Sequence, residues 1–159
     1  MSSEHLNALS QEVLDAAFRV HSELGPGLLE SAYVACLAYE LRKVGLQVRT
    51  EVAVPVVYDG VKLADVGYRI DLLVEDEIVV EVKSVESLAP VHHAQLISYL
   101  KLSDRRLGLL LNFNVARLVD GISRKVNKFC GGCGALRFPA EGAEVSRSAR
   151  RKWREEWRS

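Results

Sequence analysis

The fold is decided by sixteen residues, Tyr68 to Lys83, which read YRIDLLVEDEIVVEVK. Two apolar runs flank a short acidic stretch at positions 75–77, a pattern typical of a β-hairpin. Because side chains alternate along a strand, Glu81 and Lys83 share one face of the second run, whereas its other face is entirely aliphatic. The stretch therefore predicts a hairpin with charged groups on an otherwise apolar sheet.

The register of this hairpin determines which charged groups meet. A three-residue turn that pairs Val74 with Ile78 places Asp71 directly opposite Glu81. Opposed Cβ atoms in such a ladder lie about 4.5–5.5 Å apart, and like charges at that separation are destabilising. A cation between the two carboxylates would explain the arrangement. A two-residue turn would instead oppose Asp71 to Val80, so the interpretation depends on register.

Carboxylate oxygens are the ligands of a hard cation such as Mg²⁺, which fills its other positions with water and substrate phosphate. Lys83 lies two residues beyond Glu81 and points into the same site, where it could orient or deprotonate a water, or balance the charge of a phosphate. The alternative is a solvated polar face on which Glu81 and Lys83 are ordinary strand neighbours.

Three further residues could contribute to this site. Glu30 lies in the first turn of a predicted helix; with Gly27 as N-cap it would be a helix-stabilising residue, and otherwise it is another carboxylate for the metal or its water. Gln95 and Tyr99 are four residues apart and so share a helical face. They could bind a phosphate or hold Lys83, or they could be a polar stripe beside a core helix.

The four histidines do not form a metal-binding pattern. His92 and His93 are adjacent and point apart on a helix, so we interpret them as surface residues. His21 lies on an apolar stripe and is interpreted as a partly buried histidine with a hydrogen-bond partner.

The composition is that of an ordinary globular chain of 159 residues, 48% hydrophobic and 26% charged, with a formal net charge of zero. Residues 1–100 carry a net charge of −8 and residues 101–159 carry +8. This asymmetry fits a metal site beside a polyanion track, self-complementary surfaces, or a basic tail. The neutral total argues against strong non-specific affinity for nucleic acid.

The beginning of the chain has no basic and apolar targeting pattern, and no run is as apolar as a membrane span. We therefore expect a cytoplasmic protein without a membrane partner.

The element order is predicted to be α-α-β-β-β-α-β-β. The helices are expected at residues 10–24, 28–44 and from 90 onward, and the strands at 48–57, 61–74, 78–83, 107–113 and 116–119. Ser10 is the expected N-cap of the first helix, and Pro55 indicates an edge strand. This order predicts an α/β (α+β) fold, a central mixed β-sheet flanked by helices.

Residues 130–159 differ in composition from the rest. They begin with Cys130-Gly-Gly-Cys133 and end in a basic segment with two tryptophans. The cysteine spacing occurs in zinc and redox sites, but a structural zinc ion needs four ligands, and the chain has no second pair. We predict a domain at residues 1–129 followed by an extension at 130–159, through which copies of the chain could associate.

The segment GLLESAY, with Gly27, Glu30 and Tyr33, resembles the signature of the family called GxxExxY after this motif. The hairpin at 68–84, the helix at 90–102 and the apolar strand at 107–113 also resemble that family's blocks, in the same order. The resemblance covers about residues 10–128. The family is placed in the PD-(D/E)XK nuclease-like superfamily, whose members hydrolyse phosphodiesters using Mg²⁺ on a restriction-endonuclease-like core.

The resemblance implies a role for each matching position. Asp71, Glu81 and Lys83 match the motif's acids and lysine, and Glu30 matches the helical acid that precedes them. Gln95 and Tyr99 match a Q-x-x-x-Y pattern found in part of the superfamily. Ile70 stands where the superfamily's name has a proline.

The prediction is a nuclease that hydrolyses DNA or RNA. Asp71, Glu81, the Val82 carbonyl and Glu30 would hold Mg²⁺, with Mn²⁺ as a second candidate ion, and the catalytic set would add Lys83, Gln95 and Tyr99. Arg117, Arg124 and Lys125 are candidates for contacts to the nucleic-acid backbone. One alternative is a catalytically silent module that binds nucleic acid or protein, and another is an assembly protein that acts through its tail.

Overall fold

The computed structural model describes residues 2–128, with only the backbone described at residues 64–67. The elements are α1 (Ser3–Leu24), α2 (Glu30–Lys43), β1 (Val48–Tyr58), β2 (Val61–Val74), β3 (Ile78–Lys83), α3 (Pro90–Leu102), β4 (Leu107–Asn112), the 3₁₀ helix η1 (Leu118–Gly121) and β5 (Ile122–Val126). The predicted α+β class and the order of helices and strands are confirmed. The predicted division at residue 129 and the Cys130/Cys133 pair lie outside the described residues.

Five strands form one mixed sheet in the order β1-β2-β3-β4-β5. The pairs β1–β2, β2–β3 and β4–β5 are antiparallel, whereas β3 and β4 are parallel and are joined by the crossover helix α3. β1 is an edge strand with an irregular register at Pro55, as expected for a residue that cannot donate a ladder hydrogen bond.

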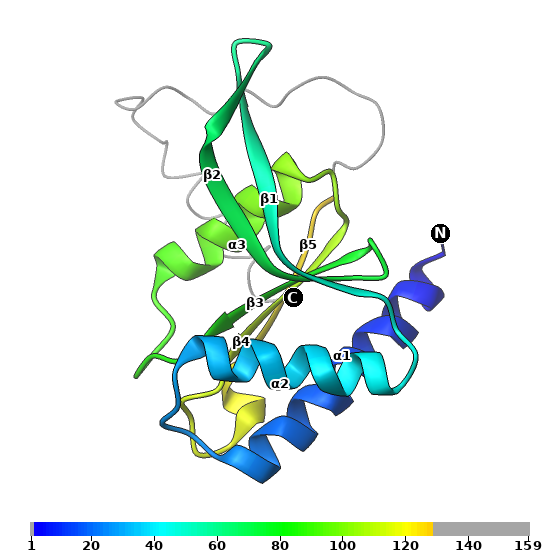
Figure 1. Ribbon diagram of the computed structural model, residues 1–159, viewed down its shortest axis with the longest axis vertical. Helices are drawn as coiled ribbons and strands as arrows, with labels where there is room; N and C mark the ends of the chain where they lie inside the picture. The colour runs from blue at the N-terminus through cyan, green and yellow to red at the C-terminus, as the bar shows by residue number, and fades with distance from the viewer. Residues whose placement is uncertain (1, 129–159) are drawn as a thin grey trace, which may run out of the picture.

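Two hydrophobic cores lie on opposite faces of the sheet. The larger core packs α1 and α2 against β4 and against five aliphatic residues of β2 and β3, namely Leu72, Val74, Ile78, Val80 and Val82. The smaller core packs α3 against Val54, Ile70, Leu73, Val79 and Leu110. The result is three layers, with α1 and α2 together on one face and α3 on the other (Figure 1).

The loop end of β1 and β2 extends past the helices as a two-stranded arm (Figure 1). Several large apolar side chains along this arm are exposed, including Tyr58, Val61 and Tyr68. The arm therefore carries apolar surface that neither core covers.

The register of the central hairpin is the one predicted from a three-residue turn. Val74 pairs with Ile78, and Leu72 pairs with Val80. The alternative two-residue turn is excluded. In the turn, Glu75 and Asp76 have φ of 52° and 57°, a left-handed conformation that Asp tolerates better than most residues.

Three local predictions were wrong. Helix α1 begins at Ser3 and is capped by Ser2, whose hydroxyl accepts a hydrogen bond from the His5 amide at 3.3 Å; Ser10 is buried inside the helix. Apolar positions continue upstream at Leu6 and Leu9, so the stripe extends the helix past a plausible cap. The short strand expected at 116–119 is replaced by η1, and the last strand follows it.

Among residues 2–128, no helix is both long and apolar enough to cross a membrane.

Candidate active site

Asp71 and Glu81 lie where β2 and β3 stop pairing. The regular ladder ends at Leu72 and Val80, one position before the two acids. The Val82 amide donates to the Asp71 carboxylate at 2.9 Å, and the Asp71 amide donates to Glu81 Oε1 at 3.3 Å. Each carboxylate thus accepts a hydrogen bond from a backbone amide of the other strand. In a regular ladder, a backbone carbonyl would accept that bond. The predicted juxtaposition of the two acids is present.

Both acids are electrostatically destabilised in this position. Glu81 is only 2% exposed, and its burial, followed by the negative charge of Asp71, raises its pKa to about 8. Burial is also the main cause that raises the pKa of Asp71, and the charge of Glu30 adds to it. The positive charge of Lys83 acts in the opposite direction on the pKa of both acids. Such shifts concentrate at functional sites.

Glu30 reaches this region from α2. It is the first residue of the helix, and Leu29 is the N-cap, so the predicted Gly27 cap was wrong. Glu30 Oε1 accepts a hydrogen bond at 3.3 Å from the amide of Ser84, the residue after Lys83. The carboxylate therefore lies at the end of β3.

The loop before α2 is held by two side chains that the sequence argument did not assign to the site. The buried Tyr33 donates to the Gly25 carbonyl at 2.6 Å, accepts from the Leu28 amide at 3.1 Å, and stacks on Phe113. The Ser84 hydroxyl donates to the Leu28 carbonyl at 2.6 Å. These contacts fix the start of α2, and so Glu30, against the end of β3. The motif tyrosine thus has a structural function in positioning its glutamate.

Gln95 and Tyr99 lie on the same face of α3 and contact each other. Gln95 Nε2 donates to the Tyr99 hydroxyl at 2.8 Å. Tyr99 is 3% exposed, and burial, followed by the negative charge of Glu81, raises the pKa of its phenol. Tyr99 therefore lies near the acids on the α3 side of the sheet, and Gln95 contacts its hydroxyl.

Asn112 was also missed by the sequence argument. It is buried at the end of the apolar strand β4, where its amide donates to the Val85 carbonyl at 2.9 Å and accepts from the Val85 amide at 3.1 Å. This pair of bonds holds the chain that leaves β3 after Lys83. The signal was present in the sequence, because Asn112 is a polar residue at the end of an otherwise apolar run.

The histidines lie apart from this site or serve the fold. His21 is partly buried, and its Nε2 lies 2.8 Å from the Val115 carbonyl, as predicted. His92 Nδ1 accepts from the Ala89 amide and so stabilises the start of α3. His93 lies beside Ser123 on β5.

Whether this site can bind a metal ion depends on Asp71 and Glu81. Within residues 2–128, no group of three or more His, Cys, Asp or Glu residues is arranged to hold an ion. Asp71 and Glu81 supply two adjacent carboxylates, and neither forms a salt bridge with a described residue. Mg²⁺ commonly binds through one or two carboxylates and keeps several waters, so this donor set fits such an ion.

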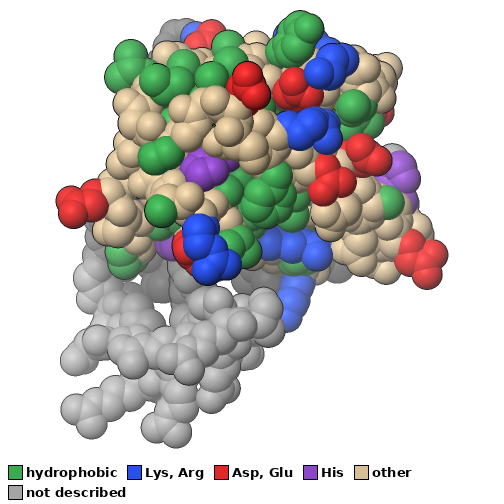
Figure 2. Space-filling model, turned by 90° about the horizontal axis from the view of Figure 1, so that it is seen from below, with side chains coloured by type: hydrophobic (Ala, Val, Ile, Leu, Met, Phe, Trp, Pro, Cys, Tyr) green, Lys and Arg blue, Asp and Glu red, His purple; other side chains and the backbone are tan. Residues whose placement is uncertain are grey.

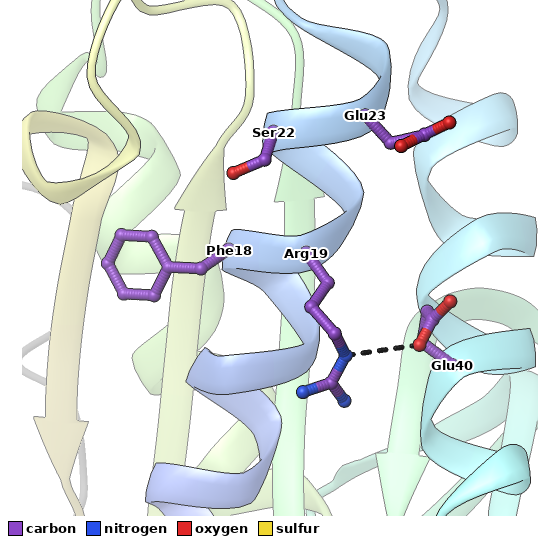
Figure 3. Close-up of a pocket in the computed structure, with 5 residues that line it drawn as sticks. All are labelled: Phe18, Arg19, Ser22, Glu23 and Glu40. Atoms are coloured by element: carbon purple, nitrogen blue, oxygen red, sulfur yellow. Dashed lines mark hydrogen bonds and ion pairs between the residues drawn. The ribbon is translucent and has the colours of Figure 1, made fainter.

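Two hollows on the described surface lie away from these acids, on α1 and α2. One of about 620 Å³ is lined by Phe18, Arg19, Ser22, Glu23 and Glu40, between α1 and α2. Within it, Arg19 crosses to Glu40 while Phe18 points away from α2 (Figure 3). None of the predicted site residues lines it. The arrangement of charged groups therefore identifies the candidate active site.

A family model described as the PD-(D/E)XK nuclease superfamily matches residues 7–125. The chain belongs to this superfamily. No curated protein and no solved structure matched it. The mixed sheet with helices on both faces is consistent with the PD-(D/E)XK core, and membership indicates nuclease activity on a nucleic-acid substrate. PD-(D/E)XK nucleases generally use divalent metal ions.

Proposed function

We propose that this PD-(D/E)XK chain is a GxxExxY-type phosphodiesterase that cleaves DNA or RNA with Mg²⁺ or Mn²⁺. The observation that carries the proposal is the pair Asp71 and Glu81. Two carboxylates from neighbouring strands are held together at the end of their ladder, without a cationic salt-bridge partner among the described residues, in a position where their charges oppose each other. A stable fold has no need of this pair, whereas a cation would neutralise it.

Each residue has a defined task in this proposal. Asp71, Glu81 and the Val82 carbonyl would hold the ion, and Glu30 would support its water shell. When bound, the ion supplies polarisation of the phosphate and a lower pKa for the attacking water. Lys83 orients that water and offsets negative charge on the phosphate. Gln95 and Tyr99 limit how far the acids and the lysine can move.

The test is cleavage of labelled single- and double-stranded DNA and RNA with Mg²⁺, with Mn²⁺, and with a chelator. We expect metal-dependent cleavage by the wild type and its loss in Asp71→Asn and in Lys83→Ala. The matched control is Asp76→Asn, the same chemical change at the other end of the hairpin, which should retain activity. Equal activity of Asp71→Asn and the wild type would refute the assignment.

A silent binding module is the second candidate. The observation that favours it is the burial of Glu81, which is 2% exposed. Burial raises the pKa of this carboxyl to about 8 and so favours its neutral form when no cation is bound. This candidate predicts that nucleic-acid binding survives chelation and that no metal ion supports cleavage.

A further inference from the structure

Tyr68 lies beside the candidate active site, although it does not belong to the superfamily motif. It is on β2, three residues before Asp71, and its side chain is 48% exposed. Its ring centroid lies 5.8 Å from that of Tyr99, with the planes tilted by 55°. The negative charges of Glu81 and Asp71 in turn contribute to the raised pKa of Tyr99, so this ring lies near both acids. Tyr68 is therefore the outer member of an aromatic pair whose inner member borders the acids.

Burial distinguishes the two rings. Tyr99 is 3% exposed and belongs to the core beneath α3, together with Val54 and Ile70. Tyr68 pairs across the ladder with Val54 but leaves about half of its side chain in water. Exposed apolar residues are common on protein surfaces, so exposure alone indicates nothing. The location of Tyr68 is informative, because its ring contacts the buried ring of Tyr99 and is also about half exposed to solvent.

The distance from the acids suits a nucleotide. Three residues of strand cover about 10 Å, which is within reach of the base attached to the sugar next to a phosphate held at Asp71 and Glu81. An exposed aromatic ring at this distance is the arrangement with which proteins stack a nucleobase, a contact that tolerates any base because every base has a π-face.

The charge distribution of the chain favours base stacking over phosphate contacts as the source of affinity for nucleic acid. The formal net charge of the chain is zero, and residues 1–100, which contain the acids, carry −8. The described side chains on the face in Figure 2 mix acidic, basic and hydrophobic groups. Counterion release from a long basic track is therefore a weak source of affinity for this part of the chain, whereas stacking needs no positive charge.

We propose that Tyr68 stacks the nucleobase next to the scissile phosphate, and that this nucleotide is unpaired in the substrate. The inference rests on the proposed function and narrows it to single-stranded nucleic acid, or to single-stranded ends of duplexes. A base inside a duplex already has neighbours on both faces, so it offers no face to an external ring. Tyr68 is thus a specificity residue rather than a catalytic residue.

The experiment compares full-length wild type, Tyr68→Phe, Tyr68→Trp and Tyr68→Ala on a twelve-nucleotide thymidine oligomer. The measurements are repeated with a set of oligomers of the same length, each of which carries a single abasic site at a different position. Dissociation constants are measured by fluorescence anisotropy in chelator, and KM and kcat in Mg²⁺. The matched control is Tyr58→Ala, which removes an exposed tyrosine at the far end of the arm. Thermal unfolding of every variant reports on its stability.

We expect Tyr68→Ala to weaken binding and to raise KM roughly 5- to 150-fold, which corresponds to the loss of one base–aromatic stack of about 1–3 kcal/mol. We expect kcat to stay within about twofold, and Phe and Trp to restore binding, because the π-face is retained. When the abasic site lies at one particular position, the wild type and Tyr68→Ala should bind the oligomer with equal affinity, because the base that Tyr68 contacts is then missing.

Equal binding by the wild type and Tyr68→Ala on the intact oligomer would overturn the inference. A deficit that persists at every abasic position, or that Tyr68→Phe shares, would also overturn it, because the effect would then not be stacking. If the wild type neither binds nor cleaves any nucleic acid, the proposed function fails as well. Cleavage that does not depend on Tyr68 refutes the stacking role alone.

Discussion

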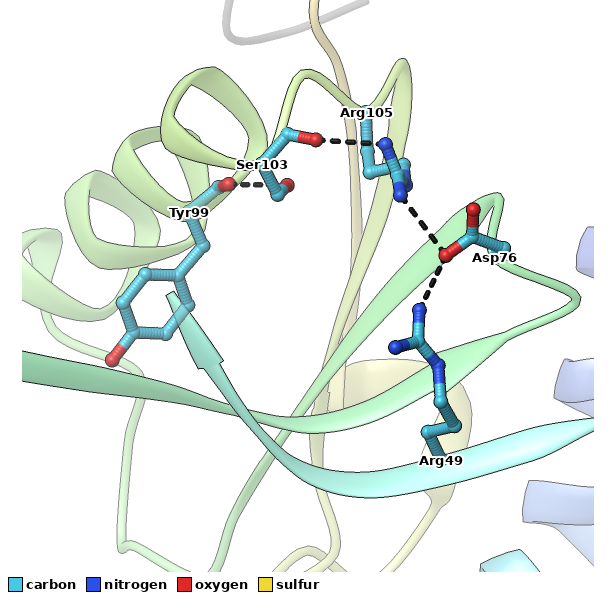
Figure 4. A network of polar contacts seen from close by, with 5 residues as sticks. All are labelled: Arg49, Asp76, Tyr99, Ser103 and Arg105. Atoms are coloured by element: carbon cyan, nitrogen blue, oxygen red, sulfur yellow. Dashed lines mark hydrogen bonds and ion pairs between the residues drawn. The ribbon is translucent and has the colours of Figure 1, made fainter. Parts of the chain in front are cut away.

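The two ends of the β2–β3 hairpin treat acidic side chains in opposite ways. At the turn, Asp76 accepts hydrogen bonds from Arg49 on β1 and from Arg105, the latter at 2.9 Å (Figure 4). These arginines, Arg105 first, lower the pKa of Asp76. At the open end, burial raises the pKa of both Asp71 and Glu81, and the negative charge of Asp71 raises the pKa of Glu81 further.

The two ends of the hairpin therefore have different roles, one in stability and one in function. The turn end places its acid in solvent between two arginines, where the charge is favourable and holds three segments together. The open end buries two acids together, at a cost to stability, and leaves them for a ligand. Native proteins accept such local costs at functional sites. The comparison therefore predicts that substitutions at the two ends have opposite effects on activity and stability.

The largest expected effect is on catalysis at the open end. Glu81→Gln keeps the shape of the side chain and removes its charge, so we expect metal-dependent cleavage to fall at least about a hundredfold. Asp76→Asn, the equivalent loss of a carboxylate charge at the turn, should leave cleavage within about twofold. Initial rates at saturating Mg²⁺ provide the measurement. Comparable losses in the two variants would break the proposed division of tasks.

The second effect is a gain in stability from the same Glu81→Gln substitution. Because the folded pKa of Glu81 lies near 8 and the unfolded value near 4.5, the wild type loses stability as pH rises between these values. Each pKa unit corresponds to about 1.4 kcal/mol. We therefore expect the variant to be more stable by roughly 2–4 kcal/mol at pH 9 and equal to the wild type near pH 4.

Urea unfolding in chelator at both pH values measures this difference. The chelator is needed because a cation bound by the wild type would stabilise the folded state and mask the cost. A Glu81→Gln variant that is less stable than the wild type at pH 9 would contradict the proposal that the charge of Glu81 destabilises the fold.

The sequence predicted the hairpin, because side-chain alternation marks its two strands. It left two registers open, and only the structure selects the three-residue turn that brings the two acids together. The sequence also placed Glu30, Gln95 and Tyr99 near them, partly through family resemblance. It did not predict the loop contacts of Tyr33 and Ser84, which depend on how α2 packs at the end of β3. Local patterns describe single elements well, whereas contacts between elements distant in the chain depend on tertiary packing.

The third effect is a loss of stability at the turn end. Arg105 donates to the Ser103 carbonyl at 2.8 Å and to Asp76, and its side chain is 27% exposed. Its Nε is buried without a hydrogen-bond partner among the described residues, which offsets part of the gain. We expect Arg105→Ala to cost about 1–2 kcal/mol and to leave cleavage unchanged. Arg49→Ala, at a 60% exposed side chain, is the control and should cost less.

The smallest effect concerns the pH and salt dependence of the Asp76 contacts. Because the arginines lower the pKa of Asp76 in the folded state, its contribution is present above the unfolded value of 3.8 and is lost as pH falls through the folded value. Asp76 is 61% exposed, so solvent screening limits this contribution to roughly 0.2–1 kcal/mol.

The wild type and Asp76→Asn should therefore differ in stability at pH 7 in low salt and converge either in 1 M NaCl or near pH 2. Glu81→Gln should keep most of its advantage in 1 M NaCl, because a buried pair is screened much less than an exposed one. Denaturant midpoints for the three proteins, measured at two salt concentrations, make this comparison. If salt instead removed the Glu81→Gln advantage and left the Asp76→Asn deficit intact, the open end would be the solvated end, and the electrostatic basis of the site assignment would fail.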